Sequence, residues 1–134
     1  MFETYEISVK TGSEGMKNIT ERIEEKISES ELDEGLCLVF SKHTTAGITI
    51  NEDERGLKQD VLDSFRRMVP EDESYGHNRG HDGNATSHIK NVLTGPGKTV
   101  PFKDGKISMG TWQEIFLVET DGPRNRTISI TLIN

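Results

Sequence analysis

Cysteine is almost absent from this chain, since its 134 residues contain only Cys37. A single cysteine excludes an intrachain disulfide and a metal site built from several cysteines. Cys37 lies in the apolar run Gly35–Phe40, where a thiol behaves as a small hydrophobic side chain, so we expect a buried residue and not a nucleophile. A chain of this length can bury enough surface to fold without disulfides. The sequence therefore predicts one domain over residues 1–134.

Long hydrophobic runs and basic clusters are also missing. No stretch has the length of a membrane span, and Met1–Lys10 lacks the apolar core of a signal peptide, so we expect a cytoplasmic protein with no membrane partner. The formal net charge is −7, and the largest basic cluster is Arg66-Arg67. Nucleic-acid-binding proteins usually present a basic face, so we expect no nucleic acid as partner. A small phosphorylated ligand needs only a local pocket of donors and stays open.

Strand patterns outnumber helix patterns along the chain. Phe2–Lys10 and Arg126–Ile133 alternate apolar and polar residues, as half-buried strands do. In Gly35–Ser41 both the odd and the even positions carry apolar residues, which predicts a central strand covered on both faces. Further strands are expected over residues 46–50, 98–102, 106–109 and 111–119, with a hairpin turn at 103–105.

The first of three expected helices follows the N-terminal strand. Apolar residues recur at spacings of three and four from Met16 to Ile27, which predicts an amphipathic surface helix. Thr11, with Glu14 three residues further on, offers a capping signal for it.

Two more helices are expected in the second half of the chain. Asn51 and Asp53 are candidate N-caps of a helix that Pro70 ends. A shorter helix is expected over residues 84–93, with Ala85, His88 and Val92 on its buried side. Hairpin-connected strands with two to three helices define an α+β fold, with a mainly antiparallel sheet.

The four histidines lie in two stretches, His43–Glu52 and His77–His88. His43 directly follows the expected central strand, among small hydroxyl residues and a glycine that let a ligand approach the backbone. The others lie in or just after residues 71–83, a long polar segment of the kind that is usually either disordered or functional. Both stretches are candidate ligand sites, although an isolated histidine at a strand end is often only a surface residue.

Neutral imidazole is a common zinc ligand, and three protein ligands with one open position are typical of catalytic zinc. The histidine spacing matches no strong signature such as His-Glu-x-x-His. A core-facing His88 needs a metal, a carboxylate or a carbonyl as partner. For His77, a role as a ligand and a role as a surface residue fit the sequence equally well. We expect His81 to be a solvated loop residue.

Two other features offer groups for a ligand. Trp112 and Gln113 open an apolar strand and can supply a stacking face and a hydrogen bond, although a tryptophan there usually packs at the core edge. A tight turn carries Arg124 and Arg126, whose guanidinium forks suit phosphate, although turn arginines are more often solvated.

Several separated motifs occur in a fixed order: His43-Thr44-Thr45-Ala46 with Asn51-Glu52, Tyr75-x-His77, Asp82-x-Asn84 with His88, Gly110-x-Trp112-Gln113, and Asp121-Gly122-Pro123-Arg124. In this order they resemble the YjbQ-like family, also labelled secondary thiamine-phosphate synthase. The resemblance covers nearly the whole chain, and only His81 departs from the family pattern.

The resemblance implies a β-sandwich-like core, a homotrimer, and a pocket on which His43, His77 and His88 converge as a candidate metal or anion site, with a divalent metal as the expected cofactor. Zinc is expected first, with magnesium or manganese as alternatives. The implied activity joins a pyrimidine diphosphate to a thiazole phosphate and releases pyrophosphate, which cations and backbone amides can stabilise. Candidate catalytic residues are His43, Glu52 and Asp82. Candidate substrate-binding residues are Thr44, Thr45, Asn84, Trp112, Gln113 and Arg124, and Lys42 and Arg126 are further candidate phosphate donors.

Two other functions fit the same residues. In a metal-dependent hydrolase the three histidines hold zinc, and Glu52 or Asp82 handles the proton of the bound water. A non-enzymatic trimer that binds a small ligand or a metal explains the same pattern without turnover.

Overall fold

The computed structural model describes residues 1–79 and 83–134. Asp82, expected to be catalytic, and His81, expected to be solvated, lie outside the described residues. The elements, in chain order, are β1 (Phe2–Lys10), β2 (Gly15–Asn18), α1 (Thr20–Glu29), β3 (Glu34–Ser41), β4 (Ala46–Asn51), α2 (Arg55–Met68), the 3₁₀ turn η1 (Gly76–Asn78), α3 (Ala85–Thr94), β5 (Gly97–Lys103), β6 (Lys106–Ile107), β7 (Glu114–Glu119) and β8 (Asn125–Ile133).

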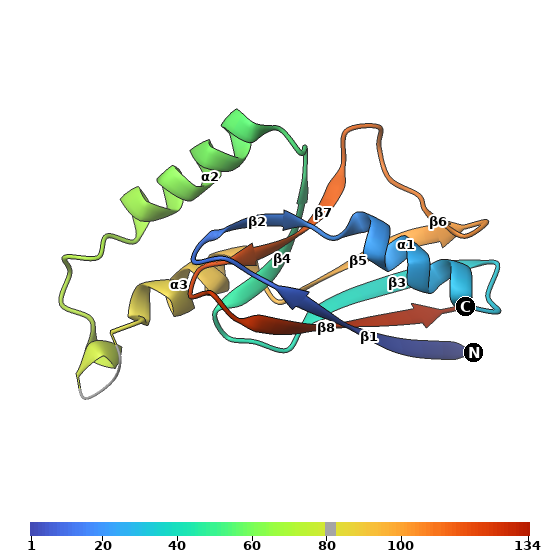
Figure 1. Cartoon of the computed structure of the whole chain (residues 1–134), viewed down its shortest axis with the longest axis horizontal. Coiled ribbons are helices and arrows are strands. Elements are labelled where there is room, and N and C mark those ends of the chain that lie inside the picture. Colours follow the sequence, from blue (N-terminus) through green and yellow to red (C-terminus); the bar gives the residue numbers. More distant parts are fainter. Residues whose placement is uncertain (80–82) are drawn as a thin grey trace.

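The strands form two antiparallel sheets. One has the order β1-β8-β3-β5-β6 and the other the order β2-β7-β4. The expected α+β class with a mainly antiparallel core is thus confirmed, and β3 has the central place expected for it. Both termini lie at one end of the molecule, while α3 and η1 lie at the other (Figure 1). Among the described residues, no helix is long and apolar enough to cross a membrane.

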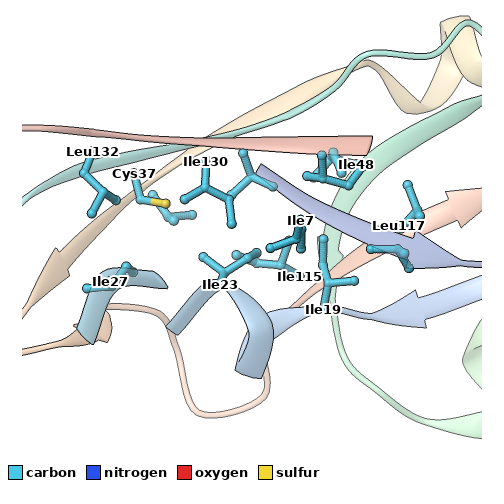
Figure 2. Close-up of a cluster of buried hydrophobic side chains, with 14 of the residues drawn as sticks. Ile7, Ile19, Ile23, Ile27, Cys37, Ile48, Ile115, Leu117, Ile130 and Leu132 are labelled. Carbon is cyan, nitrogen blue, oxygen red and sulfur yellow. The ribbon is translucent and has the colours of Figure 1, made fainter. Parts of the chain in front are cut away.

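The core lies between α1 and the two sheets. Ile19, at the N-cap of α1, and Ile23 and Ile27 within it are almost fully buried. Ile23 and Ile27 face side chains from β3 and β8, and Ile19 lies beside Ile115 of β7 (Figure 2). Cys37 on β3 is fully buried among them, and burial raises the pKa of its thiol to about 12. The thiol is therefore protonated and packed as a hydrophobic group, which confirms the core cysteine.

The first helix begins later than its apolar spacing suggested. Met16 lies in β2, opposite Val118 of β7, and the helix starts at Thr20. The edge of the second sheet takes residues 15–18 because their backbone groups find partners there. Thr11 caps no helix, since its hydroxyl donates to Glu119 instead.

The N-cap of α2 was also predicted wrongly. Glu54 caps the helix, with its carboxylate accepting the N–H of Leu57 at 2.8 Å. Asn51 ends β4, and Asp53 pairs with Lys58 at 2.6 Å. The helix ends at Met68, before Pro70, as expected.

Two expectations about burial were wrong. On β3, Cys37 and Val39 are buried, but Leu36 on the opposite face is 49% exposed, so the strand is covered on one face only. On α3, Val92 was expected inside and is 82% exposed, and His88 is half-buried. Hydroxyl groups face inward on this helix, because each finds a partner there; the Oγ of Ser87, for example, donates to the carbonyl of Thr120 at 2.5 Å.

The hairpin and the strand that follows it are shorter than expected. Asp104 and Gly105 form the turn between β5 and β6 with positive φ angles of 51° and 79°, which is the conformation that such turns need. The strand expected over 106–109 ends at Ile107, and the one expected from Thr111 begins at Glu114.

Candidate functional site

A buried ion pair lies close to the candidate site, where β7 ends and β8 begins. The Nε of Arg126 donates to Oε1 of Glu119 at 2.7 Å, and both side chains are almost fully buried. Thr11 donates a further hydrogen bond to Glu119 at 2.6 Å. Burial opposes ionisation of Glu119, but the hydrogen bonds from Arg126 and Thr11 outweigh it and leave its pKa below the ordinary value. The carboxylate is therefore ionised at neutral pH.

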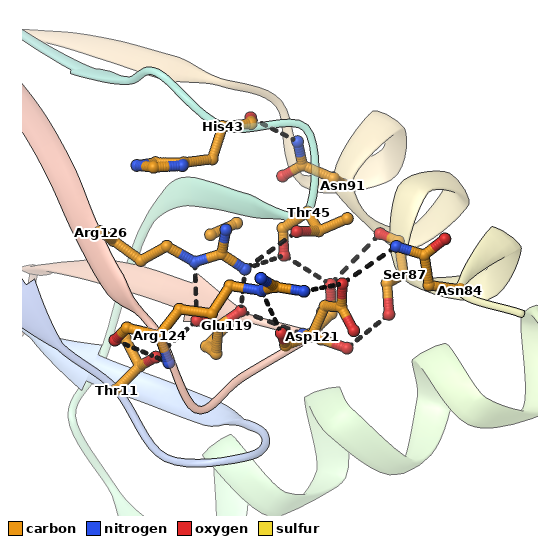
Figure 3. A network of polar contacts seen from close by, with 12 residues as sticks. Thr11, His43, Thr45, Asn84, Ser87, Asn91, Glu119, Asp121, Arg124 and Arg126 are labelled. Atoms are coloured by element: carbon orange, nitrogen blue, oxygen red, sulfur yellow. Dashed lines mark hydrogen bonds and ion pairs between the residues drawn. The ribbon is translucent and has the colours of Figure 1, made fainter. Parts of the chain in front are cut away.

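The same arginine holds the connection between β3 and β4. The Nη2 of Arg126 donates to the hydroxyl of Thr45 at 2.9 Å, and Thr120 donates its hydroxyl to the Thr45 carbonyl at 2.8 Å. Figure 3 shows Arg126 between this connection and Glu119. Three segments far apart in sequence are thus joined beneath His43.

His43 is held in one protonation state. Its Nε2 accepts the backbone N–H of Thr127 at 2.8 Å, so the neutral ring carries its proton on Nδ1. Burial lowers the pKa of His43, and the positive charge of Arg126 lowers it further. At neutral pH His43 is therefore a neutral imidazole with one donor, Nδ1–H, left to use.

The N-terminal part of α3 is tied to the turn between β7 and β8. Asn84 donates through Nδ2 to Asp121 at 3.0 Å, and Arg124 donates to the same carboxylate oxygen at 3.2 Å. Oδ1 of Asn84 lies 3.1 Å from Nε2 of His77. The rings of His77 and His88 meet edge to face, with centroids 4.6 Å apart. A polar chain thus runs from His77 in η1 through Asn84 and Asp121 to Arg124. Figure 3 shows its part from Asn84 to Arg124.

A cavity of about 490 Å³ opens between the strand connection and α3. Its lining residues are His43, Thr44, His88, Asn91, Val92, Gly95 and Pro96. Asn91 donates to the carbonyl of His43 at 3.3 Å, and its own Oδ1 is buried with no hydrogen-bond partner in the described part of the chain. A larger cavity, of about 610 Å³, lies at the other end of the molecule around Leu36 and Phe102.

A glycine lets the helix approach this closely. A Cβ on Gly47 would lie 2.5 Å from Oδ1 of Asn91 and 2.5 Å from the carbonyl oxygen of Gly95. No side chain fits between them, so the glycine noted beside His43 serves helix packing.

The structure brings together most of the expected site residues from every motif except Gly110-x-Trp112-Gln113. His43, Thr44, Thr45, Asn84, His77, His88, Arg124 and Arg126 lie at this end of the molecule. Glu119, Ser87 and Asn91 also belong to this end, although no sequence motif includes them. Asn91 follows His88 by three residues, so helical spacing alone pointed to it.

Glu52, Trp112 and Gln113 lie elsewhere. Strand β4 runs antiparallel to β7, with Ala46 opposite Glu119 and Asn51 opposite Glu114. At roughly 3.4 Å per residue, the far ends of these strands are about 17 Å from the His43 end. Trp112 is 72% exposed and does not pack at the core edge. The sequence motifs therefore form two groups, one at each end of the β4–β7 pair.

The described residues contain no group of three histidine, cysteine, aspartate or glutamate side chains placed to hold a metal. His77 and His88 are in contact, but Nε2 of His43 is occupied by the Thr127 amide. The three-histidine ligand set thus stays a prediction.

The family model for UPF0047 protein YjbQ-like matches residues 5–134, and the chain belongs to this family. Among curated relatives, a UPF0047 protein of Methanothermobacter thermautotrophicus is 44% identical over 115 residues, which is 86% of this chain and 80% of the relative. The UPF0047 protein YugU of Bacillus subtilis is 35% identical over 134 residues, and the match covers 99% of each chain.

Solved structures agree with this assignment. A protein of unknown function from Sulfolobus solfataricus has a TM-score of 0.93 at 36% identity, with 98% of this chain and 96% of that chain covered. A hypothetical protein from Aeropyrum pernix has a TM-score of 0.92 at 34% identity, with 98% of both chains covered. The family resemblance inferred from the motifs is confirmed.

Proposed function

We propose that the cavity beside His43 binds a small phosphorylated substrate, and that the chain catalyses a transfer of the thiamine-phosphate synthase type. In this reaction the ring nitrogen of a thiazole phosphate forms a bond to the carbon that carries the diphosphate of the pyrimidine. The carbon–oxygen bond breaks, and pyrophosphate leaves with the electron pair. The protein's task is to orient the two rings and to stabilise the negative charge on the leaving group.

The hydrogen bond from the Thr127 amide to Nε2 of His43 is the observation that carries this proposal. A neutral imidazole whose Nε2 is already occupied can only donate through Nδ1, and a donor suits a phosphate oxygen. Thr44 borders the same cavity, and Arg124 lies close enough for its charge to lower the pKa of His43. None of the described residues that line the cavity carries a carboxylate. The local surroundings therefore favour an anion, although the whole chain carries a net charge of −7.

The remaining polar groups would position these donors. The Arg126–Glu119 pair holds Thr45 and neighbours Thr127, whose amide fixes the imidazole of His43. Asp121 holds the guanidinium of Arg124 through its backbone carbonyl at 2.8 Å and its carboxylate at 3.2 Å. In the proposed reaction these groups act through His43 and Arg124 and not on the substrate itself.

The test supplies the purified protein with the pyrimidine diphosphate and the thiazole phosphate and follows thiamine phosphate by chromatography. We expect formation that falls by roughly 10²-fold or more in His43→Ala, the size of effect seen when one donor to developing charge is removed. Arg124→Ala should also fall, whereas Arg67→Ala, which removes an exposed arginine from α2, should match the wild type. No product from the wild type at saturating substrates contradicts the proposal.

A second candidate, a metal-dependent hydrolase, is favoured by the contact between His77 and His88. These two imidazoles could supply two of the three ligands that a catalytic zinc needs, and such a zinc lowers the pKa of its bound water. Mass spectrometric metal analysis of untagged protein separates the candidates. A stoichiometric metal that is lost in both His77→Ala and His88→Ala supports the hydrolase, and a wild type that stays metal-free when zinc or manganese is supplied excludes it.

A further inference from the structure

A second cavity lies where β1 ends and β8 begins, next to the candidate site. It has a volume of about 280 Å³ and is lined by Lys10, Thr11, Pro123, Arg124 and Asn125. None of these five residues is acidic, although the whole chain carries a net charge of −7. Ligand cavities usually span about 300–1,000 Å³, so this one is small. It suits a single functional group, such as a phosphate, better than a whole substrate.

Two lysines make the surroundings of this cavity positive. Lys10 lines the cavity, and the ammonium group of Lys17 donates a hydrogen bond to the backbone carbonyl of Lys10 at 2.7 Å. Neither lysine forms an ion pair within the part of the chain that the structure describes. Both positive charges are therefore available to an anion.

Arg124 adds a fork of donors to the same cavity. Its Nε donates to the carbonyl of Asp121 at 2.8 Å, and its Nη2 donates to the Asp121 carboxylate at 3.2 Å. A guanidinium has five N–H donors, and Nη1 donates to no residue among those described. Because the side chain is 53% exposed, its remaining donors can reach a ligand.

Two carboxylates beside this cavity already have cationic partners. Glu119 accepts the hydroxyl of Thr11 and is neutralised by the buried guanidinium of Arg126. Glu14, which follows Thr11 on the connection from β1 to β2, pairs with Arg66 of α2 at 2.9 Å. Neither carboxylate leaves an unbalanced negative charge beside the two lysines, so the excess charge at this place is positive.

Arg124 connects the two cavities. It lines the smaller one, and its charge acts on His43, which lines the larger one. Figure 3 shows Thr11 of the smaller cavity and His43 of the larger one on opposite sides of Arg126. A reaction between two substrates gains most when the protein holds both in a fixed relative position. Two anionic groups, one in each cavity, would flank the cations of this region.

We propose that the cavity lined by Lys10 and Arg124 binds the phosphate of a phosphomonoester, the second substrate, while the cavity beside His43 binds the diphosphate of the first. The diphosphate belongs beside His43, because charge develops on it as it leaves and the imidazole offers a fixed donor there. The phosphomonoester keeps its phosphate throughout the reaction, so its site needs only to anchor it, for which a lysine point charge suffices. Its assignment to the thiazole phosphate rests on the proposed function, whereas phosphate binding itself does not.

Titration with inorganic phosphate tests this site without any need for activity. In ¹⁵N-labelled protein we expect saturable shifts of the backbone amide signals of Thr11, Arg124 and Asn125. Lys10→Gln keeps a long polar side chain but removes the charge, and it should weaken this binding roughly 10-fold or more, the usual value of a hydrogen bond to a charged group. Amide signals that do not shift, or an affinity that is unchanged in Lys10→Gln, overturn the proposal.

Lys103→Gln is the matched control. Like Lys10, Lys103 is exposed and is the last residue of a strand, but it lines the cavity around Leu36 and Phe102 at the other end of the molecule. This variant should bind phosphate as the wild type does, and circular dichroism should show that both variants keep their fold. An equal loss of affinity in both variants means that overall charge attracts the phosphate, and it overturns the proposal.

Steady-state kinetics assign the site to one of the two substrates. If the transferase activity exists, Lys10→Gln should raise the KM for the thiazole phosphate roughly 10-fold and leave kcat and the KM for the pyrimidine diphosphate unchanged, because an anchoring contact is equally strong before and during the reaction. An active variant with an unchanged KM for the thiazole phosphate overturns this inference while the proposed function stands. If the wild type forms no product, the proposed function fails, and the phosphate titration alone decides the site.

Discussion

Replacing Arg126 by methionine removes the cation that neutralises Glu119 inside the protein. Methionine keeps a long side chain at the position, so the change is mainly one of charge and hydrogen bonding. The side chains of Arg126 and Glu119 are only 4% and 3% exposed, so solvent cannot take over from the lost partner. Breaking such a buried pair costs roughly 3–5 kcal/mol, because an uncompensated charge stays behind.

That cost is large against the whole stability of a domain. Free energies of unfolding are typically about 5–15 kcal/mol, and small proteins lose about 1–3 kcal/mol of it per molar urea. Urea unfolding followed by circular dichroism should therefore show a midpoint about 1 M or more below that of the wild type. A variant whose free energy of unfolding stays within about 0.5 kcal/mol of the wild type would refute the reasoning.

The double variant Glu119→Leu with Arg126→Met separates the charge from the rest of the network. Apolar replacement of a buried ion pair is often neutral or stabilising. Here we expect only partial recovery, because the hydroxyl of Thr11 and the amide of Asp121 both lose their acceptor on Glu119.

The pH dependence should change as well. In the wild type the pKa of Glu119 is lowered, so its contribution to stability is present above the ordinary carboxyl pKa and is lost as pH falls through the folded-state value. Without Arg126 the buried carboxylate has its pKa raised, so acid relieves the isolated charge. The difference in stability between Arg126→Met and the wild type should then shrink as the pH falls towards 4 or below, a value near the ordinary carboxyl pKa of about 4.3.

Three further predictions concern single residues. Glu54→Ala removes the N-cap of α2 and should cost about 0.5–2 kcal/mol in urea unfolding. Gly47→Ala forces a methyl group against a backbone carbonyl and should cost about 1–3 kcal/mol, whereas Gly12→Ala, with nothing within 4 Å of its Cβ, should show no such clash cost. NMR titration should give His43 a pKa below that of an unfolded histidine; its contribution to stability is then present above the unfolded pKa and is lost as pH falls towards the folded value.

Local sequence patterns correctly predicted the strands whose side chains point alternately into the core and towards solvent. Phe2–Lys10 and Arg126–Ile133 were found as strands at almost these bounds, because parity decides which side chains are buried. The apolar spacing predicted the wrong element at Met16. Apolar residues three and four positions apart do not exclude a short edge strand, and here residues 15–18 pair with β7. The spacing misled again at Val92, because the hydroxyl side chains of the same helix find hydrogen-bond partners inside the protein and the apolar side then faces solvent.

The candidate site was predicted in part, for a similar reason. His43 and its neighbours were identified because small hydroxyl residues and glycine after an apolar strand are unusual locally. Glu119 was not identified as the partner of Arg126, because their pairing depends on how β7 and β8 meet. Motif order also grouped Glu52 with His43, but the length of β4 carries the two residues to opposite ends of the sheet.

The central claim is that the cavity beside His43 binds a phosphorylated group, and NMR of the histidine ring nitrogens tests it most directly. Pyrophosphate and the pyrimidine diphosphate are each added to protein with ¹⁵N-labelled histidine. We expect saturable shifts of the Nδ1 signal of His43 and of the His88 ring signals, with Nε2 of His43 still hydrogen-bonded to Thr127. Unchanged histidine signals at saturating ligand would contradict the account.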